Sequence, residues 1–153
     1  MKHLTRILRT GLLLGTAGSL LVGCSSTDKS GSGAFASVRI AGRTPEQIRG
    51  ATVLEFEQEG YTPVDVKTPQ MVFEREGSRW DQIAYGGWMT KNVWMRVKVS
   101  VLPMQAGNYR LECQAFRVRD KGEPLESDPV ALRHSQNKPY QALLDKIAAR
   151  LAR

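Results

Sequence analysis

The chain has 153 residues, with 22 basic and 15 acidic side chains and a formal charge of +7. Three of the basic residues lie among the first nine, so the 130 residues from position 24 onward carry only +4. An excess this small does not indicate a nucleic-acid partner. It suits a plain solvated surface, and the alternative is a weak attraction to anionic polymers or lipid headgroups. The length suits one ordinary domain with its own core.

The first 24 residues have the pattern of an export signal. A basic start is followed by an apolar run at residues 11–22, which is typical of a signal peptide and too short for a membrane span of about 20 residues. The run ends in Leu21-Val22-Gly23-Cys24, which resembles the lipobox of bacterial lipoproteins. The resemblance covers only these residues. The alternative is an ordinary secretory signal with a chance cysteine.

The lipobox resemblance implies several modifications of the chain. Residues 1–23 would be removed as a signal peptide, the Cys24 sulfur would carry diacylglycerol, and the new N-terminus would carry a fatty acyl group such as palmitate. Each buried CH₂ contributes roughly 0.8 kcal/mol, so these chains would anchor the protein strongly. Ser25, in place of Asp, is similar to the pattern of lipoproteins sorted to the outer membrane. It implies a location on the periplasmic face of that membrane.

The segment after Cys24 is rich in serine and glycine, so we expect a flexible linker over residues 24–34 and a single domain over residues 35–153. A nine-residue linker of this kind spans about 15–18 Å, which would hold the domain close to the membrane. Residues 36–41 alternate as a short strand does. Thr44, Pro45 and Gln47 then predict a capped helix with Ile48 and Phe56 on its buried face.

Residues 61–76 are extended, but Pro63 and Pro69 predict an edge or bent strand that is most regular at residues 71–76. Residues 92–102 and 109–119 alternate as two strands of a hairpin. We predict that Leu102 pairs with Asn108, which places Trp94 opposite Phe116. One face of this hairpin is apolar and the other polar, and a one-residue slip would destroy that separation.

Residues 120–137 are polar and predict a loop, and residues 139–151 carry a clean apolar stripe that predicts a helix packed on the sheet. The expected class is therefore α+β, with an antiparallel sheet of about four strands, two helices on one face, and the order β-α-β-β-β-α. This architecture is similar to that of small envelope-assembly lipoproteins of the helix-grip type. A likeness at fold level implies no function.

The sequence has no recognisable catalytic or metal motif. His134 is the only histidine after position 3 and has no ligand partners at suitable spacing, and no nucleophile elbow of the Gly-x-Ser-x-Gly type is present. Cys113 lies in an apolar strand pattern, which indicates a small buried core residue. We therefore expect neither an enzyme nor a cofactor or metal ion.

The segment between the second extended region and the hairpin is unusually aromatic, with Trp80, Tyr85 and Trp88 close together. Aromatic side chains on a connection held by a rigid sheet often bind partners. They can equally complete the core or cover the end of the sheet. Trp94 and Phe116, on the polar face of the hairpin, would extend such a patch.

Three functions remain open. The first is a non-enzymatic envelope lipoprotein that binds another envelope protein through these aromatic residues. The second is a module that binds a glycan or lipid with the same residues, assisted by Arg96 and Lys98. The third is an enzyme of unrecognised type. An exposed patch would favour the first, a pocket lined by Trp80, Tyr85 and Trp88 the second, and converging buried carboxylates near His134 the third.

Overall fold

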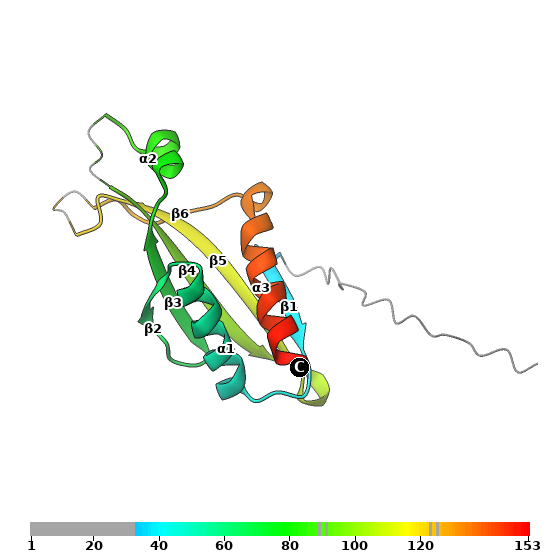
Figure 1. Ribbon diagram of the computed structural model, residues 1–153. Coiled ribbons are helices and arrows are strands. Elements are labelled where there is room, and N and C mark those ends of the chain that lie inside the picture. Colours follow the sequence, from blue (N-terminus) through cyan, green and yellow to red (C-terminus); the bar gives the residue numbers. More distant parts are fainter. Residues whose placement is uncertain (1–32, 89, 91, 123, 125) are drawn as a thin grey trace, which may run out of the picture.

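Figure 1 shows the protein as a computed structural model, which describes residues 33–88, 90, 92–122, 124 and 126–153. The predicted signal peptide, Cys24 and the linker as far as residue 32 lie outside the described residues. Within them, the chain forms a six-stranded antiparallel sheet and three α-helices. The elements in chain order are β1 (Ala36–Ile40), α1 (Pro45–Gln58), β2 (Thr62–Asp65), β3 (Gln70–Glu76), α2 (Arg79–Tyr85), β4 (Val93–Pro103), β5 (Tyr109–Arg119), β6 (Val130–Ala131) and α3 (Lys138–Leu151).

The predicted α+β class and the antiparallel sheet are confirmed, but the expected four strands and two helices are wrong in detail. The region at residues 61–76 is two strands, β2 and β3, with β2 at the edge of a sheet ordered β1-β5-β4-β3-β2. The short β6 lies in the predicted polar loop and pairs with β5 beyond the end of β1. The connection before β4 contains α2, whose seven residues are too few for a helical apolar repeat to be recognised.

Helix α1 begins as the sequence predicts. The Thr44 hydroxyl accepts from the Gln47 backbone N–H, and the Gln47 side chain accepts from the Thr44 N–H, which completes a capping box ahead of Pro45. The buried residues of α1 include Ile48 and Phe56, as expected. These contacts fix the start of the helix and direct its apolar face towards the sheet.

The β4–β5 hairpin has the predicted faces but a different register. Trp94 pairs with Val118 and Leu102 with Arg110, so the observed pairing is shifted by two residues from the prediction. Side chains alternate with a period of two, so a two-residue shift leaves both faces unchanged and apolar parity alone cannot detect it. The turn decides the register, because the loop is centred on Ala106 and Gly107, with φ of 58° and 70°.

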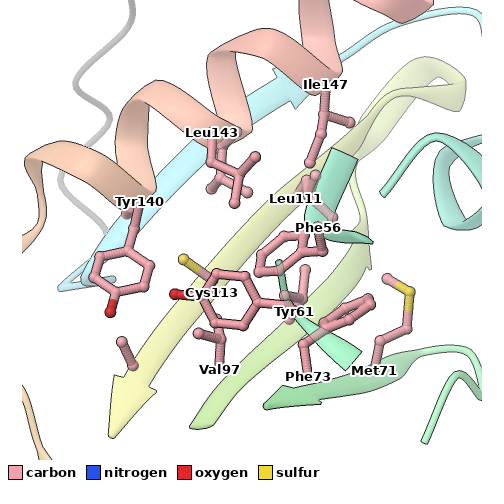
Figure 2. Packing of buried hydrophobic residues seen from close by; sticks show 14 of the residues in the cluster. Phe56, Tyr61, Met71, Phe73, Val97, Leu111, Cys113, Tyr140, Leu143 and Ile147 are labelled. Atoms are coloured by element: carbon pink, nitrogen blue, oxygen red, sulfur yellow. The ribbon is translucent and has the colours of Figure 1, made fainter. Parts of the chain in front are cut away.

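The core lies between one face of the sheet and the helices α1 and α3, which run side by side across it (Figure 1). Figure 2 shows aromatic and aliphatic side chains from both helices meeting those of the strands, with Phe56 stacked on Phe73 at 4.3 Å between ring centroids. Cys113 is buried here, as predicted, and burial together with the neighbouring Glu112 raises its pKa to about 12.

Helix α3 packs on the sheet through its predicted apolar stripe and also closes one sheet edge. The Gln141 side-chain oxygen accepts from the Ser37 backbone N–H at 3.1 Å, and its nitrogen donates to the Ser37 carbonyl at 2.9 Å. One glutamine thus satisfies both backbone groups of Ser37 that a neighbouring strand would otherwise bond. Asn137, just before the helix, donates to the Phe35 carbonyl at 2.9 Å and holds the start of β1.

Candidate functional site

Helix α2 is tied to the sheet by Gln82, in its middle, and by Gly77 just before it, which donates from its backbone N–H to the Val93 carbonyl at 2.8 Å. The Ser78 hydroxyl accepts from the Asp81 backbone N–H, and the Asp81 carboxylate accepts from the Ser78 backbone N–H, which forms a second capping box. The Gln82 side chain donates to the Val93 carbonyl at 3.2 Å. Glycines flank the helix at tight approaches. A Cβ on Gly77 would lie 2.9 Å from the Val93 carbonyl oxygen, and a Cβ on Gly86 would lie 2.3 Å from the Gln82 carbonyl oxygen. The helix therefore has a fixed position although it buries no residue.

Three large apolar side chains project from this segment, and we call Trp80, Ile83 and Trp88 the aromatic tip. Their exposed fractions are 78%, 63% and 97%. Trp80 and Ile83 share one face of α2, because residues three apart in a helix lie one above the other. Figure 1 shows α2 standing at one end of the sheet, away from α1. The aromatic tip is a projecting surface, since side chains this exposed cannot line a pocket.

Tyr85, the remaining aromatic residue of α2, turns the other way. Its ring lies against the Arg117 guanidinium on the helix-covered face of the sheet at 4.5 Å, and its hydroxyl accepts from Gln136 at 2.6 Å. Tyr85 therefore attaches α2 to the domain, and the predicted grouping of Trp80, Tyr85 and Trp88 in one surface is wrong for this residue.

Trp94 and Phe116 do not extend the aromatic tip. Both lie on the face of the sheet opposite the helices, where Phe116 pairs with Arg96 and not with Trp94. Lys121, on the loop after β5, places its ammonium 4.2 Å from the Trp94 ring, and Val118 beside it is fully buried. The predicted continuous patch is wrong because the loop that follows β5 folds back over this end of the face.

Glu74 fastens that loop to the sheet. Its buried carboxylate accepts from Arg96 at 2.5 Å and from Lys121, and Arg96 also lies 3.9 Å from Glu126. Burial alone raises the pKa of Glu74, but the hydrogen bonds and charges of Lys121 and Arg96 outweigh burial and lower it. Arg96 is thus engaged in a structural charge cluster.

Lys98 is exposed, with its ammonium 5.3 Å from the Phe116 ring. It lies on the same face as Arg96. Lys98 is also far from α2 along β4, because the segment of α2 enters β4 at Val93, the first residue of that strand. The structure therefore does not bring Arg96 and Lys98 together with the aromatic tip into one glycan or lipid site.

The described residues contain no group of three or more histidine, cysteine or acidic side chains placed to hold a metal ion. His134 is exposed on a short 3₁₀ turn at His134–Gln136, where it contacts Asn137. Among the residues that the structure describes, no converging set of buried carboxylates surrounds it.

A second candidate site lies on the helix-covered face, where sequence reasoning placed none. It is a cleft of about 260 Å³ between the end of α1, the first turns of α3 and strand β3, and its lining includes Glu59, Tyr61, Arg75, Tyr140, Leu143 and Lys146. Figure 2 shows the Tyr61 hydroxyl directed towards Tyr140. The pKa of each tyrosine is raised, mainly by burial.

Arg75 forms part of this cleft, with its guanidinium stacked 4.7 Å from the Tyr61 ring. The sequence carries a signal for this cleft, because Arg75 follows Met71 and Phe73 in the alternation of β3 and so points to the same, apolar face of the sheet. Arg117 interrupts the apolar parity of β5 in the same way after Cys113. A cation at a core-facing strand position marks a place where the core ends or a polar group is held.

Comparison of the sequence with models of protein families and with curated proteins gave no match. Among the described residues, no helix combines the length and apolar character needed to cross a membrane.

Proposed function

We propose that the chain is a non-enzymatic lipoprotein of the bacterial envelope, anchored through Cys24 and docking a partner protein with the aromatic tip. The lipobox Leu21-Val22-Gly23-Cys24 supports the anchor. The exposed position of Trp80, Ile83 and Trp88 supports the docking role. The outer membrane is the proposed location, on the pattern of Cys24 followed by Ser25.

The exposure of Trp88 is the observation that carries the docking proposal. A tryptophan with 97% of its surface in water leaves most of a large apolar ring uncovered. Tryptophan is enriched among interface residues whose removal costs 2 kcal/mol or more. The capping box and Gln82 hold α2 in place, so the aromatic tip is presented to a partner without further ordering of its helix.

A protein partner fits this geometry better than a glycan does. Sugars are usually held in a concave site that buries most of the ligand between aromatic planes and polar groups. The aromatic tip projects, and the polar side chains Arg96 and Lys98 that would assist a glycan lie on another face of the sheet. A projecting apolar surface instead fits a groove on a second protein.

The test is site-specific photocrosslinking of the full-length chain in intact cells. A photoreactive phenylalanine derivative would replace Ile83, which leaves both tryptophans in place. The matched control carries it at Val64, a residue on β2 with a similar exposure of 59%. We expect one defined protein to be crosslinked from position 83 and not from position 64.

The captured protein would then be purified and its affinity for the full-length chain measured. Trp88→Ala should weaken binding roughly thirtyfold, the equivalent of about 2 kcal/mol, whereas Val64→Ala should leave it unchanged. Crosslinks to lipid alone, together with tip-dependent binding of the Cys24→Ser chain to phospholipid vesicles, would assign the tip to the membrane and overturn the proposal. Equal products from positions 64 and 83 would overturn it as well.

A further inference from the structure

Two arginines lie on the core face of the sheet without an acidic partner among the described residues. Arg75 on β3 and Arg117 on β5 flank Met95 of β4 in one cross-strand row. Adjacent strands are about 4.8 Å apart, so the two backbones lie roughly 10 Å from each other. The Nε atom of each is buried and has no hydrogen-bond partner in the described part of the chain. Both side chains are otherwise partly exposed, but a buried guanidinium N–H is normally paired.

The other polar groups near Arg75 are already engaged with one another. Lys146 donates to Glu59 at 2.6 Å across the rim of the cleft, so Glu59 is not the counter-ion of Arg75. The Tyr61 hydroxyl is directed towards Tyr140 (Figure 2). What remains is the guanidinium of Arg75, which lies over the Tyr61 ring and has unused N–H donors.

The walls of the cleft are apolar beside this cation. Leu143, Ala142 and Pro139 line the α3 side together with the rings of Tyr61 and Tyr140, and the charged pair of Lys146 and Glu59 completes the lining at the rim. The volume of about 260 Å³ exceeds the ~150 Å³ that accepts a benzene-sized molecule and is below the ~300 Å³ at which drug-sized sites begin. The cleft therefore fits a small ligand with an apolar body.

We propose that this cleft binds a small amphipathic carboxylate, with its carboxylate on the Arg75 guanidinium and its hydrocarbon part against Leu143 and the two tyrosine rings. Arginine pairs with carboxylates through two parallel N–H···O bonds, which satisfies donors that are otherwise unpaired. Arg117 lies in the same row and adds positive potential to the site. The proposed anchor and docking surface are not required for this binding.

The experiment is calorimetric titration of the full-length chain, held in a non-ionic detergent, with octanoate as the probe. Octanoate is kept below the concentration at which it forms micelles. Parallel titrations with 1-octanol and with inorganic phosphate separate the contributions of the hydrocarbon and the anion. We expect octanoate to bind and both single-feature probes to bind at least about tenfold more weakly. 1-Octanol lacks the charge-assisted hydrogen bonds, one of which accounts for that factor, and phosphate lacks the hydrocarbon part that would be buried in the cleft.

Arg75→Gln should reduce octanoate affinity at least about tenfold. The matched control is Arg110→Gln, which removes the same charge from the opposite face of the sheet. Amide NMR shifts of the wild-type chain give a readout that needs no variant, since octanoate should move signals of residues 59–61, 75 and 139–146. Absence of binding at millimolar octanoate, shifts confined to other residues, or unchanged affinity in a folded Arg75→Gln chain would overturn the proposal.

Discussion

Replacing Glu74 by glutamine tests whether the buried charge cluster stabilises the domain. The Glu74 side chain is 4% exposed, and its partners Arg96 and Lys121 are 23% and 32% exposed. Removing one partner of a fully buried pair costs about 3–5 kcal/mol. Because water can reach both cations once the carboxylate is gone, we expect a loss of about 2 kcal/mol for Glu74→Gln.

The assay is urea unfolding at neutral pH. For a domain of this size a loss of about 2 kcal/mol lowers the midpoint by about 1 M urea, with an unchanged slope. The matched control is Glu59→Gln, which removes the same charge from the exposed pair with Lys146 and should change the midpoint far less. Equal stability of the two variants would show that the buried charge cluster does not stabilise the domain.

The pH dependence of the same variant supplies an independent check. The folded-state pKa of Glu74 is lowered from the ordinary value of 4.5, so its contribution is present above that value and is lost as pH falls through the folded pKa. The difference in unfolding free energy between the wild type and Glu74→Gln should therefore be constant near neutrality and shrink below about pH 4.5. A difference that does not change on acidification would contradict the assignment of the stabilisation to this carboxylate.

Three further outcomes are expected. Cys113, with a pKa raised to about 12, has only about 10⁻⁴ of its thiol ionised at pH 8. It should not react with Ellman's reagent until urea unfolds the chain, and reaction of the folded protein would contradict its burial. Phe73→Ala should destabilise the domain by about 3–5 kcal/mol while Trp88→Ala changes stability by less than about 0.5 kcal/mol, measured by thermal and urea unfolding; similar losses would show that Trp88 is packed. Gly86→Ala places a Cβ against the Gln82 carbonyl, so amide exchange of α2 should accelerate while global stability is nearly unchanged, and unaltered protection would contradict the tight approach.

Local signals in the sequence were sufficient for the elements that depend on local chemistry. Thr44, Pro45 and Gln47 fixed the start of α1 because capping involves only neighbouring residues. Alternation in β4 and β5 identified both strands and their faces. Their register was missed because a two-residue shift preserves the faces, and the turn at Ala106 and Gly107 decides it.

The remaining features depend on contacts between distant segments. Helix α2 carries a capping signal at Ser78 and Asp81, but its seven residues are too few to show a helical apolar repeat. Lys121 covers the Trp94 ring. Lys121 lies in the loop after β5 and Trp94 lies in β4, and no local sequence pattern connects the two. The cleft at Arg75 combines α1, α3 and β3, and only the break in apolar parity at Arg75 hinted at it.

The contact between Gln141 and Ser37 has a consequence for crowding. Copies of a chain confined to a membrane by a lipid meet in two dimensions at high local density, and an open strand edge would then template growth of a shared sheet. The Ser37 N–H and carbonyl that a second strand would need are already bound to Gln141. At the opposite edge, β2 has four residues and includes Pro63, which has no N–H to donate. The fold thus resists edge-to-edge polymerisation under the dense packing that a lipid anchor would impose.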